Sequence, residues 1–296
     1  MGENNWEKVI IKDEVMKNII FVFSIFCVLI LVPQRIFAAD IPELKNVELK
    51  LKAKTRWYEE KTLFKGSPVI VSVLIVNESE INSNSEKVLV PLGTSEQPWH
   101  KGLSFILFKD KKPVGNIGIK SIERMNKDNH VLKGGRRIDA LFVIAPEKTL
   151  ELSDGNYRLD IVFDSTGQET KGIYPAKAQT SINFKIRAPR SKKEKSRTYV
   201  QVAEYYDFEG MLTEKAETLE KALGLNPSDK EINHALGYAY FRLGELEKSK
   251  KNFEIALEYY KKLPDDHTTS PPSQTAKMIE FHLKEINEKL GEQTNK

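Results

Sequence analysis

The sequence of 296 residues contains a single cysteine, Cys27. Phe26 precedes it and Val28 follows it, whereas the lipid-modified cysteine of a lipoprotein follows small residues at the end of an apolar run. One cysteine forms no internal disulfide, and a chain processed beyond Cys27 has no thiol nucleophile. Packed apolar cores alone must therefore hold the folded parts of the protein together.

The sequence also lacks an apolar run long enough for a comfortable membrane span of roughly 20 residues. Its best candidate is the uncharged 14-residue stretch 19–32, which Lys17 precedes and Phe37-Ala38-Ala39 follows. This pattern is typical of a secretory signal peptide, so we expect residues 1–39 to be a targeting segment and the protein to be periplasmic or extracellular. Acidic residues near the N-terminus fit a signal badly, which favours Met16 as the true start. An uncleaved anchor at 19–32 is the alternative, and it would be the only membrane contact.

Sequence motifs for catalysis and for nucleic-acid binding are absent as well. We find no Gly-x-Ser-x-Gly, no His-Glu-x-x-His, no phosphate-binding glycine loop and no cysteine pair. His100 and His130 have no carboxylates at metal-site spacing, and we interpret Asp265, Asp266 and His267 as a solvated loop. No basic stretch is interleaved with aromatic residues. We therefore expect no catalytic residue, no metal, no cofactor and no nucleic-acid partner.

Charge is distributed unevenly along the chain. Residues 40–198 contain 29 lysines and arginines against 20 aspartates and glutamates, and residues 199–296 contain 13 against 18. The front part therefore carries a formal charge of +9 and the back part −5. An acidic partner for the front part is one explanation, and a solvated surface with lysine-rich strand faces is the other.

The front part, residues 40–188, has the patterns of β-strands. Apolar residues alternate with charged ones over 47–54, and Val69–Val76 is a nearly continuous β-branched run. Further strands are expected at Gly102–Phe108, Ile138–Ile144, Tyr157–Phe163 and Ser181–Ile186, with turn residues between them. Short strands without helical periodicity predict an antiparallel β-sandwich.

A tyrosine near one strand start makes this prediction more specific. The segment 152–159, LSDGNYRL, resembles the corner before strand F of immunoglobulin-like domains, where a tyrosine hydroxyl bonds back across the corner. Tyr157 would have that role, in a domain without the family disulfide because Leu159 occupies the place of the second cysteine. The resemblance implies an immunoglobulin-like sandwich and nothing about function.

The pattern changes to a helical period after a charged linker expected at 189–198. Small and large residues then recur at a spacing of 34. In the later copy they are Leu236, Gly237, Tyr240, Gly244, Leu246, Ser249, Phe253 and Ala256. In the earlier copy they are Tyr199, Ala203, Tyr206, Gly210, Leu212, Leu219, Ala222 and Pro227.

These residues and their spacing resemble the tetratricopeptide repeat family, in which each repeat is a pair of helices. The resemblance implies an all-α module at 199–296 with repeats at 199–229 and 230–263. Ile279, Leu283, Ile286 and Leu290 lie on one helical face, so we expect a helix at 275–290 that caps the stack.

The resemblance also implies a binding surface and a class of function. The first helix of a repeat lines the concave side, and the residues that point into it here are Glu231, His234, Tyr238, Phe241 and Arg242. Aromatic residues and arginine are favoured at interface hot spots. We expect a non-enzymatic interaction or scaffold protein that binds a protein or peptide partner in this groove. If the last helix covers Tyr238 and Phe241, the groove does not exist.

Other functions stay open on the sequence alone. The protein could be an accessory or carbohydrate-binding subunit of a system that processes envelope polysaccharide or peptide, with Trp57-Tyr58 or Trp99 stacking on sugar. Core packing is the commoner use of such aromatic residues. The repeats could also serve to form a homo-oligomer.

Overall fold

The computed structural model describes residues 49–56, 62–78, 89–94, 97–122, 131–133, 135–168, 173–264 and 271–294. The targeting segment expected at 1–39, the Trp57-Tyr58 pair, His130 and the loop at 265–267 lie outside these residues. Within them, no helix combines the length and the apolar character that crossing a membrane requires.

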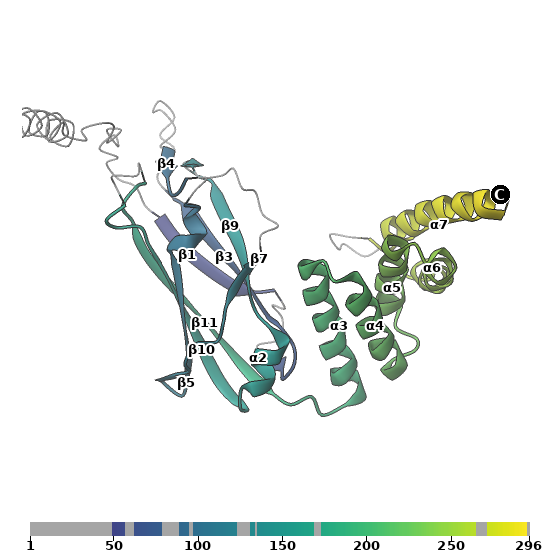
Figure 1. Ribbon diagram of the computed structural model, residues 1–296, viewed down its shortest axis with the longest axis horizontal. Coiled ribbons are helices and arrows are strands. Elements are labelled where there is room, and N and C mark those ends of the chain that lie inside the picture. The colour runs from purple at the N-terminus through teal and green to yellow at the C-terminus, as the bar shows by residue number, and fades with distance from the viewer. Residues whose placement is uncertain are drawn as a thin grey trace, which may run out of the picture.

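The front part forms two β-sheets that pack face to face (Figure 1). The first sheet has the order β1-β3-β9-β7 and the second β2-β11-β10-β5-β6. All pairs are antiparallel except β2 with β11. A small sheet of β4 and β8 adds to them. The strand bounds are β1 Leu49–Thr55, β2 Thr62–Phe64, β3 Val69–Asn77, β4 Leu89–Pro91, β5 Leu103–Lys109, β6 Lys112–Pro113, β7 Lys120–Ile122, β8 Val131–Lys133, β9 Arg137–Ile144, β10 Gly155–Asp164 and β11 Lys177–Arg187.

The predicted antiparallel sandwich is confirmed, and alternation along the strands explains its core. On β3, Val71, Val73 and Ile75 are buried between the sheets, and Leu159 and Ile161 of β10 meet them from the opposite sheet. The sheet of β1, β3, β9 and β7 faces the sheet of β2, β11, β10, β5 and β6, and the immunoglobulin-like form of this sandwich stays a prediction.

Tyr157 occupies the corner expected from the sequence. It lies near the start of β10, its ring is buried, and its hydroxyl donates a hydrogen bond of 2.6 Å to the Ser153 carbonyl. The ring stacks on Phe184 of β11. The hydrogen bond thus fixes the corner while the ring fills the core.

Two short helices interrupt the strands. The 3-10 helix η1, Trp99–Gly102, places the Trp99 ring in the core against Phe163, with only 6% of the residue exposed. Trp99 therefore cannot stack on a sugar, which corrects that part of the carbohydrate hypothesis. Helix α2, Pro146–Glu151, starts at a proline and holds buried Thr149 against the turn before β3, where its hydroxyl donates to the Ser67 carbonyl.

The back part consists of helices joined by turns and has no strand among its described residues. Its helices are α3 Lys192–Glu209, α4 Leu212–Leu225, α5 Lys230–Leu243, α6 Leu246–Tyr260 and α7 Pro272–Thr294. Consecutive helices pack as neighbours from α3 to α7. The segment 192–198, expected as part of a linker, forms the first turns of α3, because Ser191 caps that helix and Glu194 pairs with Arg187.

Glycine and serine allow the helices of the later repeat to approach closely. A Cβ on Gly237 of α5 would lie 2.5 Å from the Phe253 ring of α6. The Ser249 hydroxyl donates a 2.8 Å hydrogen bond to the Gly237 carbonyl. Gly210 and Gly244 end α3 and α5 in the left-handed conformation, which a glycine adopts without strain.

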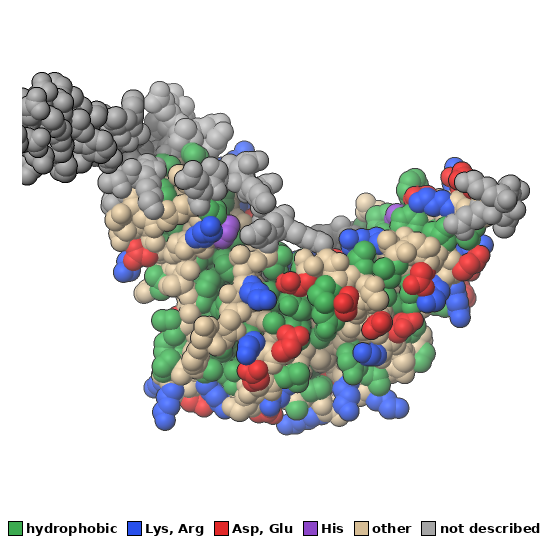
Figure 2. All heavy atoms as spheres, viewed as in Figure 1, with side chains coloured by type: hydrophobic (Ala, Val, Ile, Leu, Met, Phe, Trp, Pro, Cys, Tyr) green, Lys and Arg blue, Asp and Glu red, His purple; other side chains and the backbone are tan. Residues whose placement is uncertain are grey.

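Helix α3 also packs on the outer face of the first sheet. Tyr205 is buried against Ile70 of β3, Val143 of β9 and Ile122 of β7. Beside it, Arg56 forms an ion pair of 2.5 Å with Glu204 and lies over the Phe208 ring. The surface is continuous where the sandwich meets the helices (Figure 2).

Candidate functional site

Residues of helices α3 to α6 line an open groove of about 430 Å³. Helix α5 supplies most of its lining, because its first-helix position in the repeat leaves one side uncovered by α4 and α6. The lining residues are Asp207 of α3, Lys215 of α4, Glu231, His234, Ala235, Tyr238 and Arg242 of α5, and Tyr260 at the end of α6.

One wall of the groove is a charged cluster that links three helices. The Asp207 carboxylate forms an ion pair with Lys215 at 3.1 Å and accepts a hydrogen bond from Arg242 at 2.9 Å. The Lys215 side chain is only 14% exposed, whereas that of Arg242 is 45% exposed. Because a single carboxylate holds two cations, this wall has an excess of positive charge, and the Arg242 side chain is accessible to a ligand.

The floor of the groove is aromatic. The His234 ring lies 5.0 Å from the Tyr238 ring and 5.7 Å from the Tyr260 ring, measured between centroids. Burial lowers the pKa of His234, and nearby His282 lowers it further. His234 Nε2 is buried and has no hydrogen-bond partner among the residues that the structure describes. The groove therefore holds a neutral imidazole with an unused polar atom.

At the other end of the groove, the surroundings of Tyr260 keep its phenol protonated. Burial raises the pKa of Tyr260 to about 12, and the charges of Glu231 and Asp229 add to this shift. Lys230 lies 5.4 Å from the Tyr260 ring centre, in a cation–π contact. The phenol is thus a neutral hydrogen-bonding group at any physiological pH.

Four of the five residues proposed from the sequence line this groove together: Glu231, His234, Tyr238 and Arg242. Phe241 does not. It packs against α7, where the His282 ring lies 5.4 Å away and the Lys289 ammonium lies over its face. The last helix also contacts Tyr238, whose hydroxyl lies 3.1 Å from His282 Nε2. Helix α7 therefore covers Phe241 and one side of Tyr238 and leaves the groove open.

Asp207, Lys215 and Tyr260 also line the groove, and the sequence pattern did not predict them. Asp207 could have been found, because it precedes Phe241 by one repeat of 34 residues and so occupies the matching place on α3. Lys215 and Tyr260 belong to second helices, and only their placement in space brings them to the groove.

The lining carries groups that can bind a polypeptide segment. It contains no serine, threonine or cysteine that His234 could activate as a nucleophile. It offers an accessible guanidinium, two carboxylates, a neutral imidazole and two phenols around an aromatic floor. These groups suit hydrogen bonds and stacking with a polypeptide segment.

Comparison with known proteins agrees with this architecture. The tetratricopeptide repeat family model matches residues 196–229 and 231–263. Among curated proteins there is no match. Among solved structures, the chain is similar to PcrH in its complex with the chaperone binding region of PopD, with 11% identity and a TM-score of 0.28. That match covers 32% of this chain and 66% of the PcrH chain.

The helix pairs α3–α4 and α5–α6 fall within the two matched segments, apart from the first turn of α3 and Lys230 at the start of α5. The C-terminal part of this chain therefore carries two tetratricopeptide repeats, capped by α7.

Proposed function

We propose that this protein is a non-enzymatic interaction protein that binds a segment of a partner protein in the groove of its repeats. The observation that carries the proposal is the convergence of Glu231, His234, Tyr238 and Arg242 on one open groove with an aromatic floor. Tetratricopeptide repeats support protein–protein interaction as a class of function.

A peptide selection tests this proposal. The full chain would be used to select ligands from a random peptide library, and the affinity of the enriched peptides would then be measured for variants. Arg242→Ala removes the accessible guanidinium and should weaken binding by about 2 kcal/mol, roughly thirtyfold. Lys221→Ala removes an exposed cation of α4 outside the groove and should leave affinity unchanged.

Either of two results would contradict the groove as the site: selection that enriches no sequence, or enriched peptides that bind both variants as tightly as the wild type. Tyr238→Ala is a poorer probe, because Tyr238 also packs against α7 and its loss would reduce stability. The variants should therefore be compared only where their melting curves match that of the wild type.

We also propose that the protein acts outside the cytoplasm. The support is the pattern of Lys17, the apolar stretch 19–32 and the small residues Ala38 and Ala39. N-terminal sequencing of the native protein should find a start at Ala39 or Asp40. A native protein that retains residues 1–15 would refute this.

A further inference from the structure

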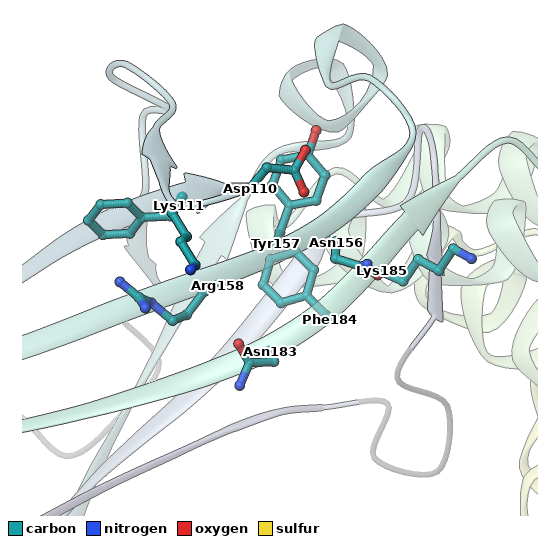
Figure 3. Close-up of a pocket in the computed structure, with 9 residues that line it drawn as sticks. Asp110, Lys111, Asn156, Tyr157, Arg158, Asn183, Phe184 and Lys185 are labelled. Atoms are coloured by element: carbon teal, nitrogen blue, oxygen red, sulfur yellow. The ribbon is translucent and has the colours of Figure 1, made fainter.

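A second pocket lies on the sandwich, and none of its lining residues belongs to the repeats. It has a volume of about 350 Å³ and lies where the outer face of the second sheet meets the β5–β6 turn (Figure 3). Asn156 and Arg158 of β10 and Asn183 of β11 line it with exposed side chains. Helix α3 packs on the other sheet, so it leaves this face uncovered.

Two cations point into the same part of this pocket. Figure 3 shows Lys111 and Arg158 side by side, while the end of Lys185 extends away from them. Arg158 uses one edge of its guanidinium to bind Asp160, at 2.8 Å and 3.0 Å, and its plane lies over the Phe108 ring. These contacts hold the guanidinium in place and leave its remaining amino group for a ligand.

Lys111 differs in that it has no partner. It forms no hydrogen bond or ion pair with any residue in the described ranges, although a like charge lies beside it. Its backbone is also strained: the β5–β6 turn consists of Asp110 and Lys111, with φ values of 49° and 67°. Aspartate tolerates this left-handed conformation, but the second position of such a hairpin turn favours glycine. A glycine would adopt this conformation without strain, so the backbone does not require a lysine at this position.

The chemistry of the pocket indicates which ligand it would take. A fixed guanidinium and a free ammonium suit a carboxylate. The amides of Asn156 and Asn183 and the carboxylate of Asp110 suit sugar hydroxyls, because together they donate and accept hydrogen bonds. The +9 charge of residues 40–198 would attract a polyanion over a longer range. We propose that this pocket binds carboxylated sugar units of an acidic polysaccharide.

Oligogalacturonate is the probe, and its methyl ester, which lacks the carboxylate charge, is the matched control ligand. Binding of each to the full chain would be measured by calorimetry. Lys111→Gly should raise the dissociation constant for oligogalacturonate at least fivefold and raise the melting temperature, because glycine relieves the turn. Arg158→Gln should raise the dissociation constant at least tenfold. Lys112→Gln removes the same charge one residue away, outside the pocket, and should change affinity less than twofold.

The combination of weaker binding and higher stability in Lys111→Gly would support the proposal, because a merely structural lysine would not produce it. If Lys111→Gly does not fold, Lys111→Asn provides the same charge loss with a residue that tolerates the turn. The proposal is overturned if oligogalacturonate does not bind, if its methyl ester or polyglutamate binds equally well, or if Lys112→Gln weakens binding as much as Lys111→Gly.

Discussion

At the scale of single residues, Gly237 shows how a missing side chain determines the packing of a repeat. Replacing it with alanine would place a methyl group 2.5 Å from the ring of Phe253, which is fully buried and cannot move away. Overpacking of this kind costs about 1–3 kcal/mol. We expect Gly237→Ala to lower the free energy of unfolding by about 2 kcal/mol in urea titrations followed by circular dichroism.

Gly224 provides the matched control for this substitution. It also lies in a helix, α4, but a Cβ there would meet nothing within 4 Å. Gly224→Ala should therefore stabilise the protein by about 0.5 kcal/mol, because alanine loses less backbone entropy on folding. If both substitutions have the same sign, the close approach of α5 and α6 does not determine the effect.

At the scale of elements, the pairing of α5 with α7 predicts a dependence on pH. Burial lowers the pKa of His234 in the folded state, and His282 of α7 lowers it further. Tyr238 and Tyr260, the rings it contacts on α5 and α6, are neutral, and Glu231 and Asp207 are the carboxylates in the same groove. In the unfolded chain a histidine has a pKa of about 6.5. Just below this pH, His234 is therefore protonated to a greater extent in the unfolded chain than in the folded state.

The sign of the effect follows from this difference. Stability is fully present above about pH 6.5 and falls as the pH drops toward the lowered folded pKa. We expect the free energy of unfolding to decrease between pH 7 and pH 5, with a smaller decrease in His234→Gln, which does not titrate. Equal slopes in the two proteins would show that His234 does not carry this dependence.

Local patterns predicted most elements, because alternation and helical periodicity are properties of short segments. The β-branched run Val69–Val76 became β3, and the 34-residue spacing became α3 to α6. Contacts between distant segments were not predictable in this way. The charges in 190–197 indicated a linker, but the pairing of Glu194 with Arg187 starts a helix there. Phe241 has the spacing of a groove residue, and only the position of α7 removes it from the groove.

At the scale of the whole molecule, α3 is shared between the two parts. One side of it packs on α4, where the Ser196 hydroxyl bonds to the Ala222 carbonyl. The other side places Tyr205 against Ile70 and Val143 of the sandwich. Burial raises the pKa of the Tyr205 hydroxyl, and the nearby Glu209 and Glu147 charges add to this. The repeats therefore pack directly on the sheet through α3 and are not connected to the sandwich by the chain alone.

A comparison of the full chain with the excised repeats measures how strongly this contact couples the two parts. In the full chain, Tyr205→Ala should lower the free energy of unfolding by about 2 kcal/mol or more, because it leaves a cavity between helix and sheet. In a fragment of residues 191–296 the same ring would face water, and the loss should be less than about 0.5 kcal/mol. Leu219→Ala, in the core between α3, α4 and α5, should cost about the same in both proteins and shows that the fragment is folded. Equal losses for Tyr205→Ala in the two contexts would mean that the ring stabilises the repeats themselves, and that the sandwich and the repeats fold as independent units.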